Sequence, residues 1–302
     1  MNFDEVTARA AELDRQGFLP MPGETAEGFF ERFRQSQEHL ETLEELLEKE
    51  GKALLFGEFQ VAAGERIPPE IIDEAAVKTD ALYSFENHRV PGFFLSKGVG
   101  ALWGGCMIGD PDNGFAAMLL RSSFRNRRKW YFYERSELLA HELCHAMRQS
   151  LSDITLEEYF AYRTSGSFLR RNLGNCFIRE RDAVLFILPA LILLGATIAK
   201  ELFRAAYPLW PFWCLAAVYP LFLLLRNFAS MRKVRKAEKA LLAFGVENPA
   251  PILFRCTCAE LETLGKLKSK EEFDAFREEI SVAELRWAII NKRFFNQEEQ
   301  LS

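Results

Sequence analysis

The chain of 302 residues has 49% hydrophobic side chains and a formal net charge of −5 at pH 7. This length and apolar content are sufficient for a large buried core and exclude a chain that is mainly disordered. The mild negative charge gives no basis for expecting a nucleic-acid partner. The mean hydropathy of −0.10 is typical of a soluble protein, but such an average can hide a short membrane segment.

The first 90 residues are predicted to form a helical region. Apolar side chains recur at helical spacing through residues 25–50, and Gly51 follows as a helix terminator. Pro68-Pro69 opens a second helix that we expect to run to about Leu82. The N-terminus has no basic segment followed by an apolar one, so we expect no cleaved signal peptide. The cysteines include no C-x-x-C pair, which indicates reduced, cytosol-facing thiols.

Residues 91–180 predict a small antiparallel sheet followed by helices. Short apolar runs at 93–95, 99–108 and 115–121 are separated by glycines and by a turn at Asn113-Gly114. We attribute the glycines to bulges and turns, because no Gly-Lys-Ser/Thr sequence follows them as in a nucleotide loop. Residues 130–133 are a further strand candidate, and a helix is expected from about Ser136 to Gln149.

The helix expected after residue 136 carries an H-E-x-x-H motif at His141, Glu142 and His145. Residues four apart share a helix face, so both imidazoles can bind one Zn2+ ion. Glu142 lies beside the open position of such a metal, where it can take a proton from the attacking water. The chain has only 4 histidines, and two of them belong to this motif. We therefore predict His141 and His145 as zinc ligands and Glu142 as the catalytic base.

A catalytic zinc needs a third protein ligand, and two glutamates after the motif are candidates. Ser152-Asp153 predicts a turn between two antiparallel helices. Glu157 and Glu158 lie about as far beyond this turn as His145 lies before it, so both reach the level of the metal. They differ by about 100° around the helix, so only one is expected to face the metal. Thr155-x-x-Glu158 also matches a capping box, and in that case Glu157 is the candidate ligand.

Tyr162 lies four residues beyond Glu158, on the same helix face, and is our candidate hydrogen-bond donor to the developing oxyanion. Over roughly residues 90–175 the chain resembles the gluzincin metallopeptidases. Glu158-Tyr-Phe-Ala-Tyr162 is similar to their Glu-x-x-Ala-Asp segment, with Tyr162 in place of the usual Asp. The resemblance implies a zincin-like α+β fold and favours Glu158 as the third zinc ligand. Its membrane-embedded members usually place a hairpin before the glutamate, and in that order Glu238 is the alternative ligand.

Two apolar runs predict a transmembrane hairpin. Residues 183–199 and 205–225 contain no charged side chain, and a bilayer core needs about 20 apolar residues, with a lower limit of about 17. A buried hairpin of a soluble protein is the alternative. Basic residues cluster before the first run and after the second, so both termini and the active site are expected on the cytoplasmic side of the inner membrane. Residues 226–302 predict a cytosolic helical region, with capping boxes at Ser269/Glu272 and Ser281/Glu284.

The sequence thus predicts a zinc metalloprotease, anchored in the lipid bilayer, that hydrolyses polypeptides at its cytoplasmic face. The resemblance implies that an extended substrate pairs with a sheet edge beside the active-site helix, supplied by residues 130–133 or 115–120. The alternative is a non-enzymatic docking platform of the same fold. Its structural or regulatory metal would need a fourth protein ligand such as Cys144 or His88. A hydrolase of non-peptide amides is a third candidate.

Overall fold

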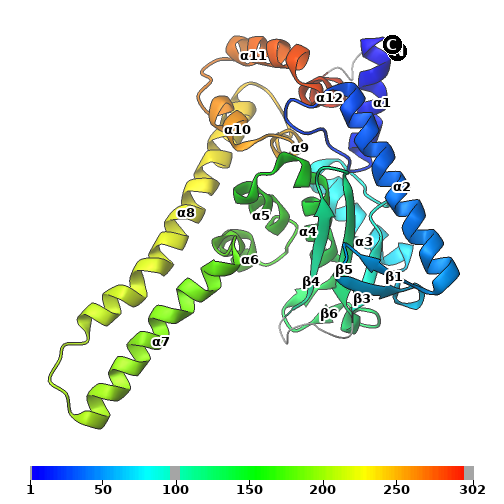
Figure 1. The fold of residues 1–302 in the computed structure, drawn as a ribbon. Helices are drawn as coiled ribbons and strands as arrows, with labels where there is room; N and C mark the ends of the chain where they lie inside the picture. The colour runs from blue at the N-terminus through cyan, green and yellow to red at the C-terminus, as the bar shows by residue number, and fades with distance from the viewer. Residues whose placement is uncertain (1, 96–102, 296–302) are drawn as a thin grey trace.

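The computed structural model describes residues 2–95 and 103–295. A body of helices and small sheets carries a long pair of helices that projects away from it (Figure 1). The class is therefore α+β, as the sequence predicts, with helices as the larger part.

The N-terminal residues form helices and one β-hairpin. The helices are α1 (Phe3–Arg15), α2 (Ala26–Glu50) and α3 (Pro69–Tyr83), and the last two agree with the sequence. Gly51 ends α2 in the left-handed conformation, which glycine adopts without strain. The expectation of a purely helical region is wrong. Between α2 and α3 lie β1 (Lys52–Leu55), β2 (Phe59–Ala62) and the 3-10 turn η1 (Ala63–Glu65), and the two strands pair antiparallel.

A three-stranded sheet packs against the helix that carries the H-E-x-x-H motif. Its order is β3 (Gly92–Leu95), β5 (Phe115–Arg121), β4 (Gly105–Asp110). β4 and β5 form an antiparallel hairpin with Gly114 at φ 68° in its turn, as expected. The expectation of a wholly antiparallel sheet is wrong, because β3 pairs parallel with β5. An apolar run does not encode the direction of its neighbour, which depends on the path of the connecting chain. Residues 99–102 of the predicted run lie outside the described residues.

Two of the glycines around β4 allow the sheet to pack closely against a helix. They do not form the bulges or turns expected from the sequence. A Cβ at Gly104 would lie 3.1 Å from the Leu138 side chain of the next helix. A Cβ at Gly109 would collide with the side chain of Gln149. The small residues therefore let β4 lie directly against the helix with the histidines.

Residues 130–133 form a tight hairpin and not the single strand that was expected. β6 (Lys129–Trp130) pairs antiparallel with β7 (Tyr133–Glu134) around a turn at Tyr131 and Phe132. The short 3-10 turn η2 (Ser122–Phe124) precedes it. Aromatic residues favour strands by propensity, but the chain reverses here after only two paired residues on each side.

The predicted helical hairpin is present. α4 (Arg135–Arg148) is followed by the 3-10 turn η3 (Gln149–Leu151), by Ser152 in the left-handed conformation, and by α5 (Ile154–Tyr162). The N-cap of α5 is Asp153, so Thr155-x-x-Glu158 is not a capping box and the Glu158 carboxylate is free for another role. α6 (Phe168–Leu173) and the 3-10 turn η4 (Gly174–Cys176) come next.

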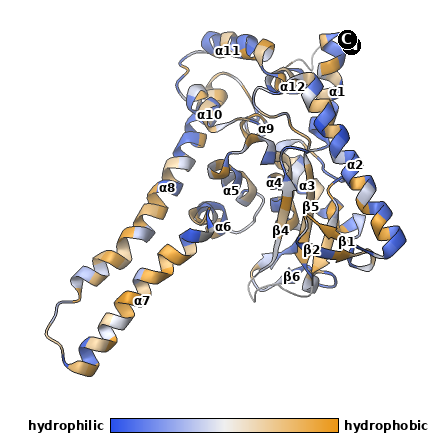
Figure 2. Ribbon diagram, viewed as in Figure 1, coloured by the Kyte–Doolittle hydropathy of each residue, from blue (hydrophilic) through white to orange (hydrophobic). Residues whose placement is uncertain are grey.

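Helices α7 (Glu180–Phe203) and α8 (Trp210–Ala243) are long and apolar enough to cross a membrane. Figure 2 shows hydrophobic residues along both. In the most apolar stretch of α7 only 6% of the residues are buried, and in that of α8 only 11%. The core of a soluble protein would bury such side chains. The alternative of a buried soluble hairpin therefore does not fit. Residues 205–209 of the second run belong to the link, and α8 continues beyond residue 225 into its basic part.

The C-terminal residues return to the body as four helices, α9 (Ala250–Phe254), α10 (Cys258–Leu264), α11 (Lys270–Ala283) and α12 (Leu285–Phe294). Ser269 caps α11 by accepting a hydrogen bond from the Glu272 N–H, but the Glu272 carboxylate accepts from the Lys268 N–H and not from the Ser269 N–H, so only half of the expected capping box is present. The capping box expected at Ser281 is wrong, because Ser281 lies inside α11 and its hydroxyl donates to the Arg277 carbonyl. The Ser-x-x-Glu pattern by itself does not distinguish a helix N-cap from a position inside a helix, because the residues around it favour a helix in either case.

The N-terminal, central and C-terminal regions share one core and one buried polar network. The largest hydrophobic cluster joins Leu19 and Tyr83 to Leu139 of α4 and to Trp287 of α12. A buried ion pair joins Asp14 to Arg255 Nε at 2.9 Å. The body is therefore closed by helices that are distant in sequence.

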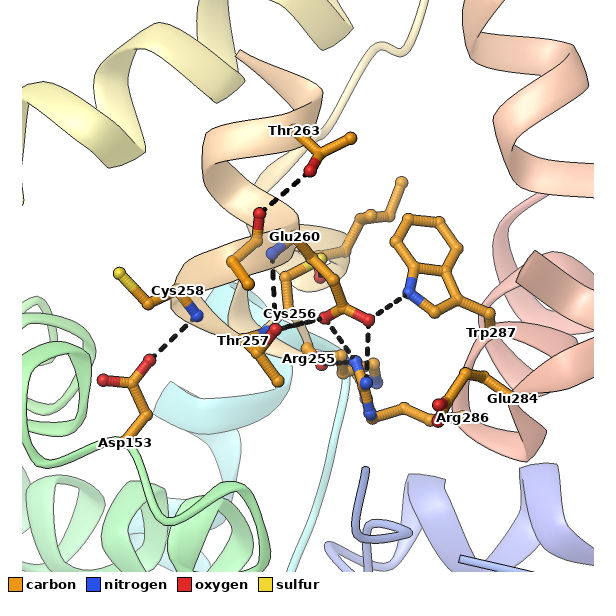
Figure 3. Close-up of polar contacts among 12 residues, drawn as sticks. Asp153, Arg255, Cys256, Thr257, Cys258, Glu260, Thr263, Glu284, Arg286 and Trp287 are labelled. Carbon is orange, nitrogen blue, oxygen red and sulfur yellow. Dashed lines mark hydrogen bonds and ion pairs between the residues drawn. The ribbon is translucent and has the colours of Figure 1, made fainter. Parts of the chain in front are cut away.

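Figure 3 shows the polar cluster that fastens α10 to α12. The Glu260 carboxylate accepts hydrogen bonds from both terminal nitrogens of Arg286, at 2.8 Å, and from the Trp287 indole N–H at 2.7 Å. Asp153 accepts a hydrogen bond from the Cys258 N–H at 2.9 Å, so the turn between α4 and α5 is tied to α10.

Candidate metal centre

Helix α4 brings both histidines of the motif onto one buried face. Their Nε2 atoms lie 3.1 Å apart and their ring centroids 4.8 Å apart. The side chain of His141 is 9% exposed and that of His145 is 13% exposed. Residues four apart lie one above the other on a helix, so the local spacing by itself produces this arrangement. Each imidazole presents one nitrogen to the same point.

Glu158 faces this point from the neighbouring helix α5. Its Oε2 lies 3.6 Å from His141 Nε2, and its Oε1 lies 3.5 Å from His145 Nε2. Two ligands bound to zinc at about 2.0–2.1 Å in a tetrahedron lie about 3.3 Å apart. The observed separations agree with this spacing to within a few tenths of an ångström. His141, His145 and Glu158 are the group of metal-ligating side chains found among the described residues.

The second ring nitrogen of the two histidines differs in its surroundings. Glu157 Oε2 lies 3.7 Å from His145 Nδ1, whereas His141 Nδ1 is buried and has no hydrogen-bond partner among the described residues. Metal-ligating histidines usually donate this second N–H to a carboxylate or a carbonyl, which turns the other nitrogen to the metal. The geometry thus distinguishes the two glutamates. Glu158 is placed as a ligand, and Glu157 is placed to orient His145.

The site is rich in negative charge. Burial lowers the pKa of His145, but the carboxylates of Glu157, Glu158 and Glu142 outweigh it and raise this pKa to about 9. Burial and the neighbouring His145 hold the pKa of His141 well below its ordinary value. Three carboxylates therefore surround two imidazoles, one of which is neutral. A divalent cation balances such a donor set, so these residues fit zinc.

Glu142 is buried beside the three candidate ligands, with 5% of its surface exposed. Its Oε2 accepts a hydrogen bond from the Met107 N–H of β4 at 2.7 Å. Burial raises the pKa of Glu142 to about 7, and the charge of His145 opposes this rise. A carboxyl group with a pKa near neutrality can both accept and return a proton. No local pattern pointed to Met107, because the contact joins a strand and a helix far apart in sequence.

Tyr162 also lies at the site. Its ring packs edge-on against His141, with the ring centroids 4.6 Å apart. A Cβ at Gly174 would collide with the Tyr162 ring, so the glycine allows this placement. Burial raises the pKa of Tyr162, which keeps its hydroxyl protonated as a donor. The structure thus places the Tyr162 ring beside His141, whereas its role stays a prediction.

Arg170 of α6 is a residue of this site that the sequence did not reveal. Its guanidinium carbon lies 5.8 Å from the ring centre of Tyr162 and 5.1 Å from that of Tyr133. Its Nη1 lies 3.5 Å from Glu137 Oε2. Arg170 lies in a basic stretch of the sequence that contains no motif, and only the packing of α6 beside α5 brings Arg170 to the site.

The other candidate ligands lie elsewhere. Cys144 is 1% exposed and belongs to the main hydrophobic core. His88 lies at the surface, with its Nδ1 3.0 Å from Asp73 Oδ1. Glu238 of α8 is not part of the group of three. Within residues 2–95 and 103–295, therefore, no fourth metal-ligating side chain joins the group.

The sheet edge beside α4 is β4, and neither of the two expected segments. Residues 115–120 belong to β5, which pairs on both sides and is the centre of the sheet. Residues 130–133 reverse in the β6–β7 turn. Among the described strands β4 pairs with β5 alone, and it contacts α4 through Met107 and Glu142. The sequence showed apolar runs here, but their order in the sheet depends on tertiary pairing.

No protein-family model matches the chain, and neither a curated protein nor a solved structure matches it. The resemblance to the gluzincins, and with it the zincin-like fold, therefore stays a prediction.

Proposed function

We propose that the protein is a zinc metallopeptidase anchored in a membrane by α7 and α8. The observation that carries the proposal is the convergence of His141, His145 and Glu158, with buried Glu142 beside them. These three side chains would hold the zinc ion. A zinc ion with three protein ligands polarises a carbonyl group and activates water.

The chain's own residues would carry the proton in this reaction. The Glu142 carboxylate accepts the proton of the attacking water and then returns it to the leaving nitrogen of the cleaved peptide bond. Its raised pKa, about 7, suits both transfers. The Tyr162 hydroxyl donates a hydrogen bond to the oxygen on which negative charge develops.

The proposed substrates are polypeptides that bind in an extended form. The free side of β4 offers a place for an added strand, because it runs beside α4 and has no pairing partner among the described strands. The basic residues that flank the two apolar helices support a location of the site, and of both termini, on the cytoplasmic side of the inner membrane.

A structural metal in a non-enzymatic protein is the weaker proposal. Such sites are closed by four protein ligands, whereas the group among the described residues has three. Glu142 also favours a catalytic site over a structural one, because buried carboxyl groups with a raised pKa are typical of active sites.

The test uses the full chain, purified in nanodiscs, with a fluorescent unfolded casein as the probe. Glu142→Gln should retain zinc, measured by atomic spectroscopy, and lose casein cleavage by at least about 100-fold, the effect of removing a general base. Glu134→Gln, at the N-cap of the same helix, is the matched control and should cleave as the wild type does. Full cleavage by Glu142→Gln would refute the mechanism, and wild-type protein without zinc would refute the metal site.

A further inference from the structure

We propose that the body makes a second contact with the bilayer through a patch formed by the β6–β7 turn and α6. The docking patch consists of Tyr131, Phe132, Phe168, Leu169 and Leu173. Its occupant is a bilayer surface that contains anionic lipid. This inference rests on the proposed membrane location of α7 and α8.

The β6–β7 turn exposes two aromatic side chains. Tyr131 is 77% exposed and Phe132 is 63% exposed. Two-residue hairpin turns normally hold Asn, Asp or Gly, because at least one of the two residues needs a positive φ. Tyr131 instead adopts φ 48°, which is uncommon for a bulky side chain. The turn therefore presents apolar surface at a position where polar residues would fit the backbone better.

Helix α6 exposes a second apolar group just before the membrane hairpin. Phe168, Leu169 and Leu173 are 70%, 65% and 45% exposed. After α6 and η4, Phe177 contacts Phe186 of α7, with the ring centroids 5.4 Å apart. The exposed face is thus continuous with the first apolar helix.

The two halves of the patch adjoin each other. Phe132 packs against Tyr133, with centroids 4.5 Å apart, and the guanidinium of Arg170 from α6 covers the Tyr133 ring at 5.1 Å. Figure 1 shows α6 at the head of α7 and β6 at the end of the body toward which the hairpin descends. Arg170 also lies over Tyr162, so one side chain joins the patch to the candidate active site.

The charges around the patch identify the occupant as an anionic bilayer. Exposed cations lie beside the aromatic turn at Arg127, Arg128 and Lys129, and Arg171 lies on α6. The side chains of Arg128 and Lys129 are 84% and 75% exposed, and their nearest carboxylates lie 3.6 and 3.8 Å away. Aromatic rings at the headgroup level together with Lys and Arg are typical of a membrane interface.

The experiment measures the depth of nitroxide labels in the full chain, in nanodiscs that contain phosphatidylglycerol. Labels are attached at Phe132→Cys and Phe168→Cys, in a background where the three thiols that are not buried are removed by Cys106→Ser, Cys214→Ser and Cys258→Ser. Matched controls are Leu54→Cys and Val282→Cys, at apolar side chains that are 59% and 85% exposed and lie far from the hairpin in sequence. Leu191→Cys in α7 reports on the hairpin itself. None of these readings requires catalytic activity.

We expect labels at positions 132 and 168 to be accessible to oxygen and shielded from a nickel complex, as at position 191, whereas labels at 54 and 282 meet both quenchers. If position 191 is in lipid and positions 132 and 168 are in water, the docking patch is refuted and the hairpin stands. If position 191 is also in water, the membrane location and the patch are both refuted. Zinc content and casein cleavage are independent of either outcome.

Discussion

Replacing Glu158 with Gln is expected to weaken zinc binding far more than replacing Glu157 with Gln. Both changes keep the size of the side chain and remove one charge. Only Glu158 lies within 3.5 and 3.6 Å of the Nε2 atoms of both histidines. Glu157 lies 3.7 Å from the Nδ1 of His145, on the other side of the ring, and its amide replacement keeps an acceptor oxygen there.

The magnitudes follow from the number of ligands. Zinc binding by four protein ligands is worth roughly 10–16 kcal/mol, or about 3 kcal/mol for each ligand. Loss of the Glu158 ligand should therefore weaken binding by about 100-fold or more. Loss of an orienting partner such as Glu157 costs at most about 10- to 100-fold, and the retained amide oxygen of Glu157→Gln favours the lower end.

The assay is competition with a chromophoric zinc chelator, applied to the wild type and to each variant in nanodiscs. Circular dichroism provides the control that both variants keep their helices. The expected order of affinity is wild type, then Glu157→Gln, then Glu158→Gln. The reverse order, or an equal loss in both variants, would refute the assignment of Glu158 as the ligand and Glu157 as its orienting neighbour.

Three further predictions concern packing, acid stability and metal removal. Gly174→Ala should displace the Tyr162 ring, lower the free energy of unfolding by about 1–3 kcal/mol, and reduce casein cleavage while zinc is retained; unchanged cleavage would contradict the proposed role of Tyr162. Burial raises the pKa of Glu260, but its hydrogen bonds and charge contact with Arg286 outweigh this and hold the pKa below 4.5. The ion pair of Glu260 with Arg286 therefore stabilises the fold above pH 4.5, and this stabilisation is lost as the pH falls through the lowered pKa of Glu260. Glu260→Gln should lower the free energy of unfolding by about 3 kcal/mol at neutral pH, and the melting temperature of this variant should depend less on pH in the acid range than that of the wild type. Removing zinc with a chelator, from a concentration about 100 times its Kd, should lower the melting temperature by about 4 °C for a chain of this length, and no shift would argue against a bound metal.

The H-E-x-x-H motif shows how much of the candidate site local spacing predicts. His141 and His145 meet because a helix repeats every 3.6 residues, and this needs no distant contact. Glu158 reaches the same level because a short turn reverses the chain into α5. The local spacing does not decide which of the two glutamates faces the histidines, because that depends on the rotation of α5 against α4.

The two apolar runs of the hairpin could also be predicted, because a stretch without charge that is long enough to cross a membrane is a local property of the sequence. The bounds of α8, from Trp210 to Ala243, could not be predicted, because the ends of a helix depend on the packing around them. The three-stranded sheet was foreseen only in part. The composition indicated strands, whereas the parallel pairing of β3 with β5 comes from the route of the chain.

Taken by itself, the sequence determined the periodic features: the two histidines on one face, the helical hairpin, and two long apolar helices. Tertiary structure alone decided that Met107 holds Glu142, that Arg170 covers Tyr162, and that β4 forms the sheet edge beside α4. The physical reason is the separation along the chain. Periodicity acts over a few residues, whereas these contacts join segments whose approach is set by the burial of one shared core.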